Sequence, residues 1–155
     1  MKKEMIIMTF IELCEFVLNF LELKDYNEII SDEFCYYRPE DDVIAMNYDD
    51  AFENADLFYE FLDSEVYPKA KEFNIILWSL LHEYGHLKDG EDPSYDMILR
   101  SLLSFAPSSS SKTMAYFRLP RERNATTWAA NYIRLNYDKC LLANDIIKDW
   151  IERNI

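Results

Sequence analysis

The chain has 155 residues, half of them hydrophobic and only 2 of them glycine, and its formal net charge is -13 at pH 7. This length and composition are typical of one compact, helix-rich domain and exclude a disordered chain. Affinity for nucleic acids depends on Lys and Arg side chains that neutralise phosphates, so the acidic excess argues against DNA or RNA as a partner.

The N-terminal stretch from residue 5 to residue 23 is apolar enough to resemble a signal peptide or a membrane span. Polar side chains interrupt it at helical spacing, however, at Glu12, Glu15, Asn19 and Glu22. This pattern predicts a mostly buried helix with a narrow polar stripe, and no small-residue cleavage site follows it. The three cysteines, Cys14, Cys35 and Cys140, are widely separated and form no CxxC pair, which favours reduced core thiols in a cytoplasmic protein over disulfides or a thiolate metal site.

Between residues 29 and 62 the pattern changes several times. We expect a short helical stretch over 29–34, then two strands over 35–37 and 43–48 joined by a turn at 38–42, and an amphipathic helix over 50–62. The two strands predict a small antiparallel sheet. Together with the helices, they predict an α+β fold, mostly helical, in a single domain that spans residues 1–155.

Residues 68–89 predict a buried helix. Pro68 suits a first helical position, the residues from Phe73 to Leu81 are apolar almost all round, and Gly90 is a suitable stop signal. Gly85 inside this helix costs about 1 kcal/mol of helix propensity relative to alanine. We therefore expect another backbone or a substrate to approach the helix closely at Gly85.

After this helix, Ser94 precedes an apolar helical segment over 95–105. The serine-rich stretch over 106–112 predicts a flexible surface loop, and two further helices are expected over 121–135 and 142–151. Charge is unevenly distributed: residues 40–65 carry only acidic charges, whereas residues 112–139 are mostly basic. The acidic segment is typical of a solvated face, or alternatively of a docking surface for a basic partner.

The two histidines of the chain both belong to one short motif, His82-Glu83-Tyr84-Gly85-His86, within the predicted buried helix. Residues four apart on a helix differ by only about 40° in direction, so both imidazoles leave the same face and can bind one metal ion. Glu83 points about 100° away from His82, where it can reach a water on the metal. This HExxH pattern is typical of zinc-dependent hydrolases, in which the glutamate is the general base.

A catalytic zinc site usually has a third protein ligand, and the sequence offers several candidates. Asp92 lies six residues after His86, at a spacing that some zinc peptidases use, and Asp89 and Glu91 compete with it. Glu122 is the other candidate, because a carboxylate at the start of a second buried helix can face the first helix across the core.

The motif and the segment from Leu119 to Ala129 together resemble the ImmA/IrrE-type metallopeptidases. In that family an HExGH helix is followed by a helix of the form ExEAxxFA, and the resemblance covers residues 43–133. Carried over position by position, it implies that His82, His86 and Glu122 bind Zn²⁺ and that Glu83 is the base. It also implies a zincin-like fold and cleavage of a helix-turn-helix repressor, often in phages or other mobile elements.

The chain departs from the family pattern at four positions. Asn124 replaces the second glutamate of the second motif, Trp128 replaces its phenylalanine, and Gly90 stands where the family often has a further histidine. Thr126 occupies a position that is often Asp or Asn and that orients the site. None of these changes removes a ligand.

Two classes of function follow from these residues. The first is a zinc endopeptidase that acts on a regulatory protein, with Tyr116 or Tyr132 as a candidate donor to the transition state. The second is a non-catalytic, acidic protein on the same scaffold that binds and inhibits a partner. A hydrolase of small amides is a third possibility, because the HExxH motif alone does not specify the substrate.

Overall fold

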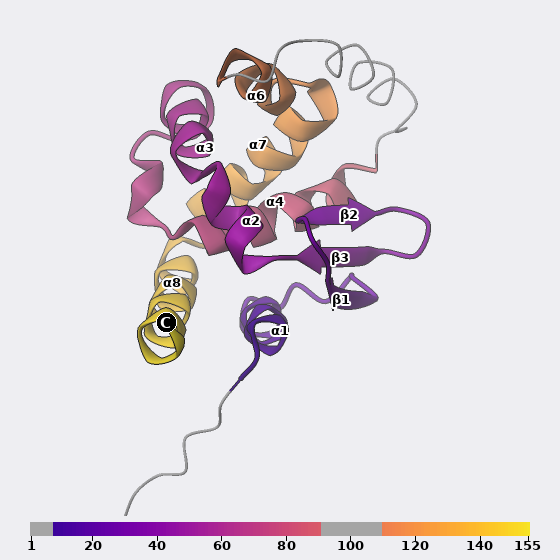
Figure 1. The fold of residues 1–155 in the computed structure, drawn as a ribbon, viewed down its shortest axis with the longest axis vertical. Helices are drawn as coiled ribbons and strands as arrows, with labels where there is room; N and C mark the ends of the chain where they lie inside the picture. The colour runs from indigo at the N-terminus through magenta and orange to yellow at the C-terminus, as the bar shows by residue number, and fades with distance from the viewer. Residues whose placement is uncertain (1–7, 91–109) are drawn as a thin grey trace, which may run out of the picture.

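The structure is a computed structural model, and it describes residues 8–90 and 110–155. Helices form most of it, and a small sheet lies at one side (Figure 1). In chain order the elements are α1 (Phe10–Phe20), β1 (Glu28–Ser31), β2 (Tyr36–Arg38), β3 (Val43–Met46), α2 (Tyr48–Glu53), α3 (Ala55–Phe61), η1 (Leu62–Val66), η2 (Ala70–Glu72), α4 (Ile75–Asp89), α6 (Ser110–Phe117), α7 (Pro120–Leu135) and α8 (Tyr137–Asn154).

The sheet has three strands in the order β1-β3-β2. The predicted pair of strands is confirmed, since β2 and β3 are antiparallel and Tyr37 lies opposite Ile44. The prediction of a helix over 29–34 is wrong, because Glu28–Ser31 forms strand β1. This strand pairs with β3 in parallel, so the sheet is mixed rather than antiparallel. Ile29 and Ile30 are β-branched, and a short apolar run of this kind becomes a strand when a neighbouring strand satisfies its backbone.

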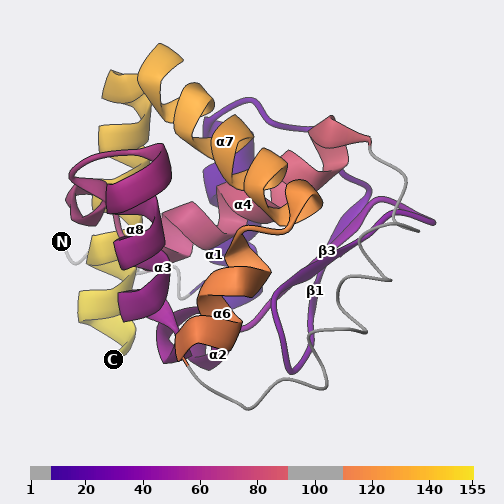
Figure 2. The same cartoon turned by 90° about the horizontal axis from the view of Figure 1, so that it is seen from above.

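Helix α4 is buried, as predicted: every residue from Ile75 to His86 is buried. It contacts β2 and β3 on one side and α7, α8 and α2 elsewhere. Figure 2 shows α7 crossing α4, with the sheet on the other side of the molecule from α8. The buried position of α4 brings the motif residues into the interior of the protein.

The start of α4 differs from the prediction. The helix begins at Ile75, with the Asn74 side chain accepting a hydrogen bond from the backbone N–H of Ile76, and not at Pro68. Lys69 adopts a left-handed conformation with φ of 64°, which prevents one continuous helix through this segment. The predicted end is confirmed, since Gly90 has φ of 62° and caps the helix in the left-handed conformation.

The remaining expectations have mixed outcomes. Helix α1 confirms a helix in the N-terminal stretch, over Phe10–Phe20, but it is buried along one face only, at Leu13, Cys14, Val17 and Leu18. Helices α7 and α8 confirm the two C-terminal helices, although α8 is longer than expected. The helix predicted over 50–62 is split at Asn54 into α2 and α3, and the loop predicted to extend to residue 112 already turns into α6 at Ser110. The helix predicted over 95–105 lies outside the described residues. In the described ranges, every helix is too short or too polar to cross a membrane.

Candidate metal centre

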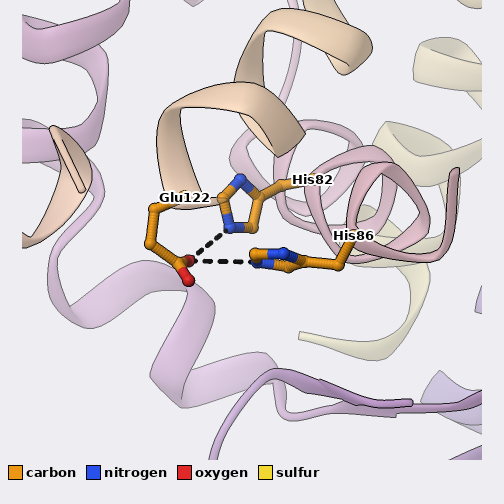
Figure 3. A group of neighbouring side chains, drawn as sticks. All are labelled: His82, His86 and Glu122. Carbon is orange, nitrogen blue, oxygen red and sulfur yellow. Dashed lines mark hydrogen bonds and ion pairs between the residues drawn. The ribbon is translucent and has the colours of Figure 1, made fainter. Parts of the chain in front are cut away.

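Helix α4 presents both histidines on one face, one turn apart, as the spacing predicts. The ring centroids of His82 and His86 are 4.8 Å apart, and both side chains are buried. Their Nε2 atoms point toward the same carboxylate, that of Glu122 (Figure 3).

Glu122 comes from the first turn of α7, 36 residues after His86, and its side chain is 1% exposed. Its Oε1 atom lies 3.0 Å from Nε2 of His82 and 3.1 Å from Nε2 of His86. One ligand atom from each of the three side chains lies within 4.8 Å of the others, so this group can hold a metal ion. Asp89 ends α4 and does not belong to the group, whereas Glu91 and Asp92 lie outside the described residues.

Gly85 explains how α7 comes near enough to supply its carboxylate. A Cβ atom at Gly85 would lie 2.4 Å from the backbone oxygen of Ala125, closer than real Cβ atoms approach any atom. The two helices therefore touch backbone to backbone at this point, which confirms the expected close approach. Since Ala125 lies in the turn directly after Glu122, this contact sets the distance between the histidines and the carboxylate.

Thr126 connects the two helices chemically. Its hydroxyl donates to the backbone oxygen of Glu122 at 2.9 Å and lies 2.9 Å from Nδ1 of His82. A hydroxyl has one proton, so with that proton on the Glu122 oxygen it must accept from Nδ1–H of His82. A neutral His82 then presents its unprotonated Nε2 to Glu122, which is the tautomer that binds a metal.

The charges of the group fit a cation. Burial by itself raises the pKa of Glu122. The hydrogen bonds and charges of His82 and His86 lower it by more than burial raises it, so the pKa of Glu122 lies well below its usual range. Glu122 is therefore ionised, and the unprotonated Nε2 of a neutral His82 would repel it at 3.0 Å. A proton or a metal ion between these atoms would relieve this repulsion. Two imidazole nitrogens and one carboxylate are a donor set that divalent zinc accepts.

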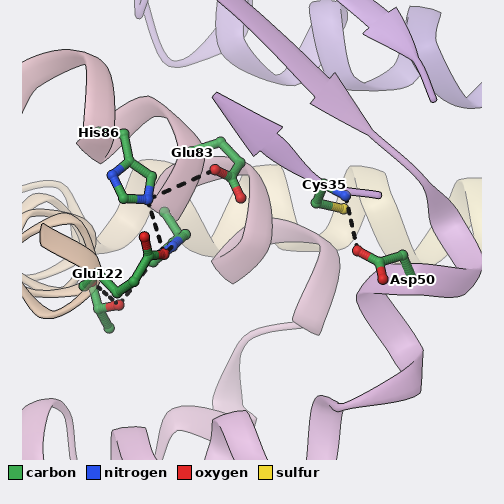
Figure 4. Close-up of polar contacts among 7 residues, drawn as sticks. Cys35, Asp50, Glu83, His86 and Glu122 are labelled. Atoms are coloured by element: carbon green, nitrogen blue, oxygen red, sulfur yellow. Dashed lines mark hydrogen bonds and ion pairs between the residues drawn. The ribbon is translucent and has the colours of Figure 1, made fainter. Parts of the chain in front are cut away.

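Glu83 lies beside the group and does not join it. It is buried, and its Oε1 atom is 4.0 Å from Nε2 of His86 (Figure 4). The side chain also lines the same cleft as the two histidines. This placement agrees with the direction expected for the residue after the first histidine, which can reach a water next to the metal.

A cleft of about 500 Å³ opens onto the group. On the side of His82 the wall is aromatic: the ring of Phe58 meets the imidazole edge to face at 5.8 Å, and Phe117 packs on Phe58 at 5.1 Å. On the side of His86, the ring of Tyr37 is parallel to the imidazole at 6.5 Å. Cys35 lines the cleft as well, and its backbone N–H donates to Asp50 (Figure 4).

The sequence did not identify these cleft residues. Aromatic residues are frequent in this chain, and nothing in their spacing separates the cleft walls from the core. Of the two tyrosines considered for transition-state binding, Tyr116 lines the cleft. Tyr132 is excluded, because its hydroxyl donates to the backbone oxygen of Leu21 at 3.0 Å, away from the metal group.

In comparisons with known proteins, no family model, no curated protein and no solved structure matched this chain. The function of the protein must therefore be inferred from the geometry of the site and from the HExxH motif over residues 82–86.

Proposed function

We propose that this protein is a zinc-dependent endopeptidase. The observation that carries the proposal is the convergence of His82, His86 and Glu122 at the floor of an open cleft, with Glu83 beside them. These four residues supply the chemistry that metal-assisted hydrolysis requires: three protein ligands, and a fourth side chain, outside the ligand group, whose carboxylate can act as a base.

The chain's own residues would divide the work as follows. A zinc ion held by His82, His86 and Glu122 would supply Lewis acidity, which polarises the scissile carbonyl and acidifies water. Glu83 takes a proton from the attacking water and passes it to the leaving amine. Thr126 keeps His82 in the tautomer with its proton on Nδ1, and the aromatic wall of Phe58 and Phe117 limits the access of bulk water to one side.

The substrate class is proposed from the motif resemblance alone. The ImmA/IrrE-type pattern favours a helix-turn-helix repressor or a similar regulatory protein. The cleft is open enough for an extended peptide, and it reaches past Glu83 to residues of β2 and α6.

Metal content and cleavage test this proposal together. We expect about one zinc per chain in the wild type by elemental analysis, and loss of zinc in His86→Ala and in Glu122→Ala. Glu152→Ala, at an exposed position of α8, is the control and should keep its zinc. Glu83→Gln should keep zinc and lose at least about 99% of its activity on a candidate repressor, because the base contributes about 10²- to 10⁴-fold.

Two results would contradict the proposal. A wild type that binds no zinc after supplementation has no metal centre of this kind. A Glu83→Gln variant that cleaves the repressor at the wild-type rate has a different mechanism. Tight, stoichiometric association with the repressor without any cleavage would favour the non-catalytic binding protein instead.

A further inference from the structure

Arg121 differs from its two neighbouring arginines. Arg118 and Arg123 both bind the carboxylate of Glu65, at 2.8 and 3.0 Å. Arg121 lies between them in the sequence but turns to the cleft, which it lines next to Glu122. Within the described ranges, no carboxylate lies at ion-pair distance from its guanidinium.

Tyr37 lines the same cleft as Arg121. Burial and the hydrogen bond to Asp42 raise the pKa of the Tyr37 phenol, and the charge of Arg121 opposes this rise. Tyr37 in turn covers the His86 ring. The cleft lining therefore includes a cation that directly precedes the ligand candidate Glu122 in the sequence.

Among the described residues that line the cleft, the charges are close to balance, although the molecule as a whole is strongly acidic. They are the three carboxylates of Asp50, Glu83 and Glu122 and the two cations of Lys112 and Arg121. A bound divalent ion would give the lining one positive charge in excess. Field lines concentrate in a cleft with low-dielectric walls, so the cleft would attract anionic groups that the rest of the surface repels.

We propose that Arg121 determines specificity by binding a carboxylate of the substrate, from an acidic side chain or from a chain terminus near the scissile bond. The inference depends on the proposed peptidase function. Arginine suits this task because its planar fork can form two parallel hydrogen bonds to one carboxylate. A substrate would then bind its carboxylate to Arg121 and could place an apolar group against Phe58 and Phe117, which line the same cleft.

The test uses peptide hydroxamates, which bind the metal and are not cleaved. One pair of probes differs only in a C-terminal carboxylate or carboxamide, and the other pair only in a Glu or Gln side chain. Titration calorimetry on the zinc-loaded protein should show that the wild type binds the acidic member of one pair about tenfold more tightly, as expected for a charge-assisted contact. Arg121→Met should lose this preference, and Arg123→Met, which loses a paired arginine outside the cleft, should retain it.

The pair that shows the preference identifies the source of the carboxylate. Equal binding within both pairs, or a preference that survives in Arg121→Met, would overturn the inference. Cleavage of a protein substrate by a wild type without carboxylate preference leaves the peptidase and removes the role of Arg121. Carboxylate preference in a protein that never cleaves would keep carboxylate binding by Arg121 and remove the peptidase function. Failure to bind any hydroxamate would remove both the peptidase function and the role of Arg121.

Discussion

Thr126 contacts two of the three candidate ligands, His82 and Glu122. Its hydroxyl contacts Nδ1 of His82 and also donates to the backbone oxygen of Glu122. Thr126 makes both contacts with a neutral hydroxyl. A carboxylate would make the imidazole more basic, so threonine holds the tautomer without adding charge.

Replacing this hydroxyl should weaken metal binding. We expect Thr126→Val to lower zinc affinity by about 10- to 100-fold, because valine keeps the shape and removes the partner of Nδ1–H. Thr127→Val, the next residue along the same helix and exposed, is the matched control and should bind zinc as the wild type does. Competition with a chromogenic chelator measures both affinities, and equal affinities in the two variants would refute the role of Thr126.

Two helices, α4 and α7, form the metal group, and their contact at Gly85 is the tightest feature of the fold. The HExxH pattern alone does not specify which residue stands at position 85, between Tyr84 and His86. The structure shows why glycine is present: the backbone of α7 occupies the space where a side chain would begin. The helix propensity lost at Gly85 is thus offset by the approach of the ligand-bearing helix.

Gly85→Ala should therefore destabilise the protein although alanine favours helices. We expect a loss of about 1–3 kcal/mol in the free energy of unfolding, from overpacking between the two backbones, together with weaker zinc binding as α7 moves away. Gly90→Ala is the contrast: its added Cβ meets no atom within 4 Å, and the cost of about 1 kcal/mol comes only from its positive φ. Urea unfolding at pH 7 compares the variants, and a Gly85→Ala protein as stable as the wild type would contradict the close packing.

The acidic segment over 40–65 is less available for docking than its composition suggests. Glu65 binds Arg118 and Arg123, and Asp41 binds Arg38. Asp63 and Asp50 accept backbone hydrogen bonds that stabilise the turns before η2 and β2. These four carboxylates therefore stabilise the structure of the chain itself.

The sequence predicted those elements whose pattern is long and local. Helix α4 has a long run of buried residues, an asparagine cap and a terminal glycine, and only its first residues were placed wrongly. Strand β1 has four residues, and it forms a strand because it pairs with β3. The two strands are neighbours in the sheet, but β2 lies between them in the sequence. Local propensity cannot report such a pairing, so the stretch was assigned to a helix.

At the scale of the whole molecule, buried thiols should make stability depend on alkaline pH. Burial raises the pKa of Cys140 to about 12, and burial together with nearby Cys35 and Glu15 raises the pKa of Cys14 as well. In the unfolded chain these thiols ionise above about pH 8.5, whereas in the folded chain they stay protonated. The unfolded state loses protons first, so this contribution to stability is complete below about pH 8.5 and is lost as the pH rises toward 12.

We expect the free energy of unfolding, measured in urea under reducing conditions, to fall between pH 8 and pH 10. The slope should approach about 1 kcal/mol per pH unit for each fully buried thiol above about pH 9. Cys140→Ala removes one of these groups and should have a shallower slope than the wild type. A free energy of unfolding that stays constant or rises over this range would show that the thiols ionise in the folded protein.

The sequence by itself determined what depends on one helix: a buried helix, two imidazoles on one face, a glutamate turned aside from them, and a glycine that marks a close contact. These features follow from the helical repeat, which acts over four residues. The packing of the chain in three dimensions was needed to show that Glu122 meets the histidines, that Thr126 sets the tautomer of His82, and that Arg121 lines the cleft with no carboxylate partner among residues 8–90 and 110–155. Those residues lie some 35 to 45 positions away along the chain, and the packing of α7 against α4, rather than any local pattern, brings them to the site.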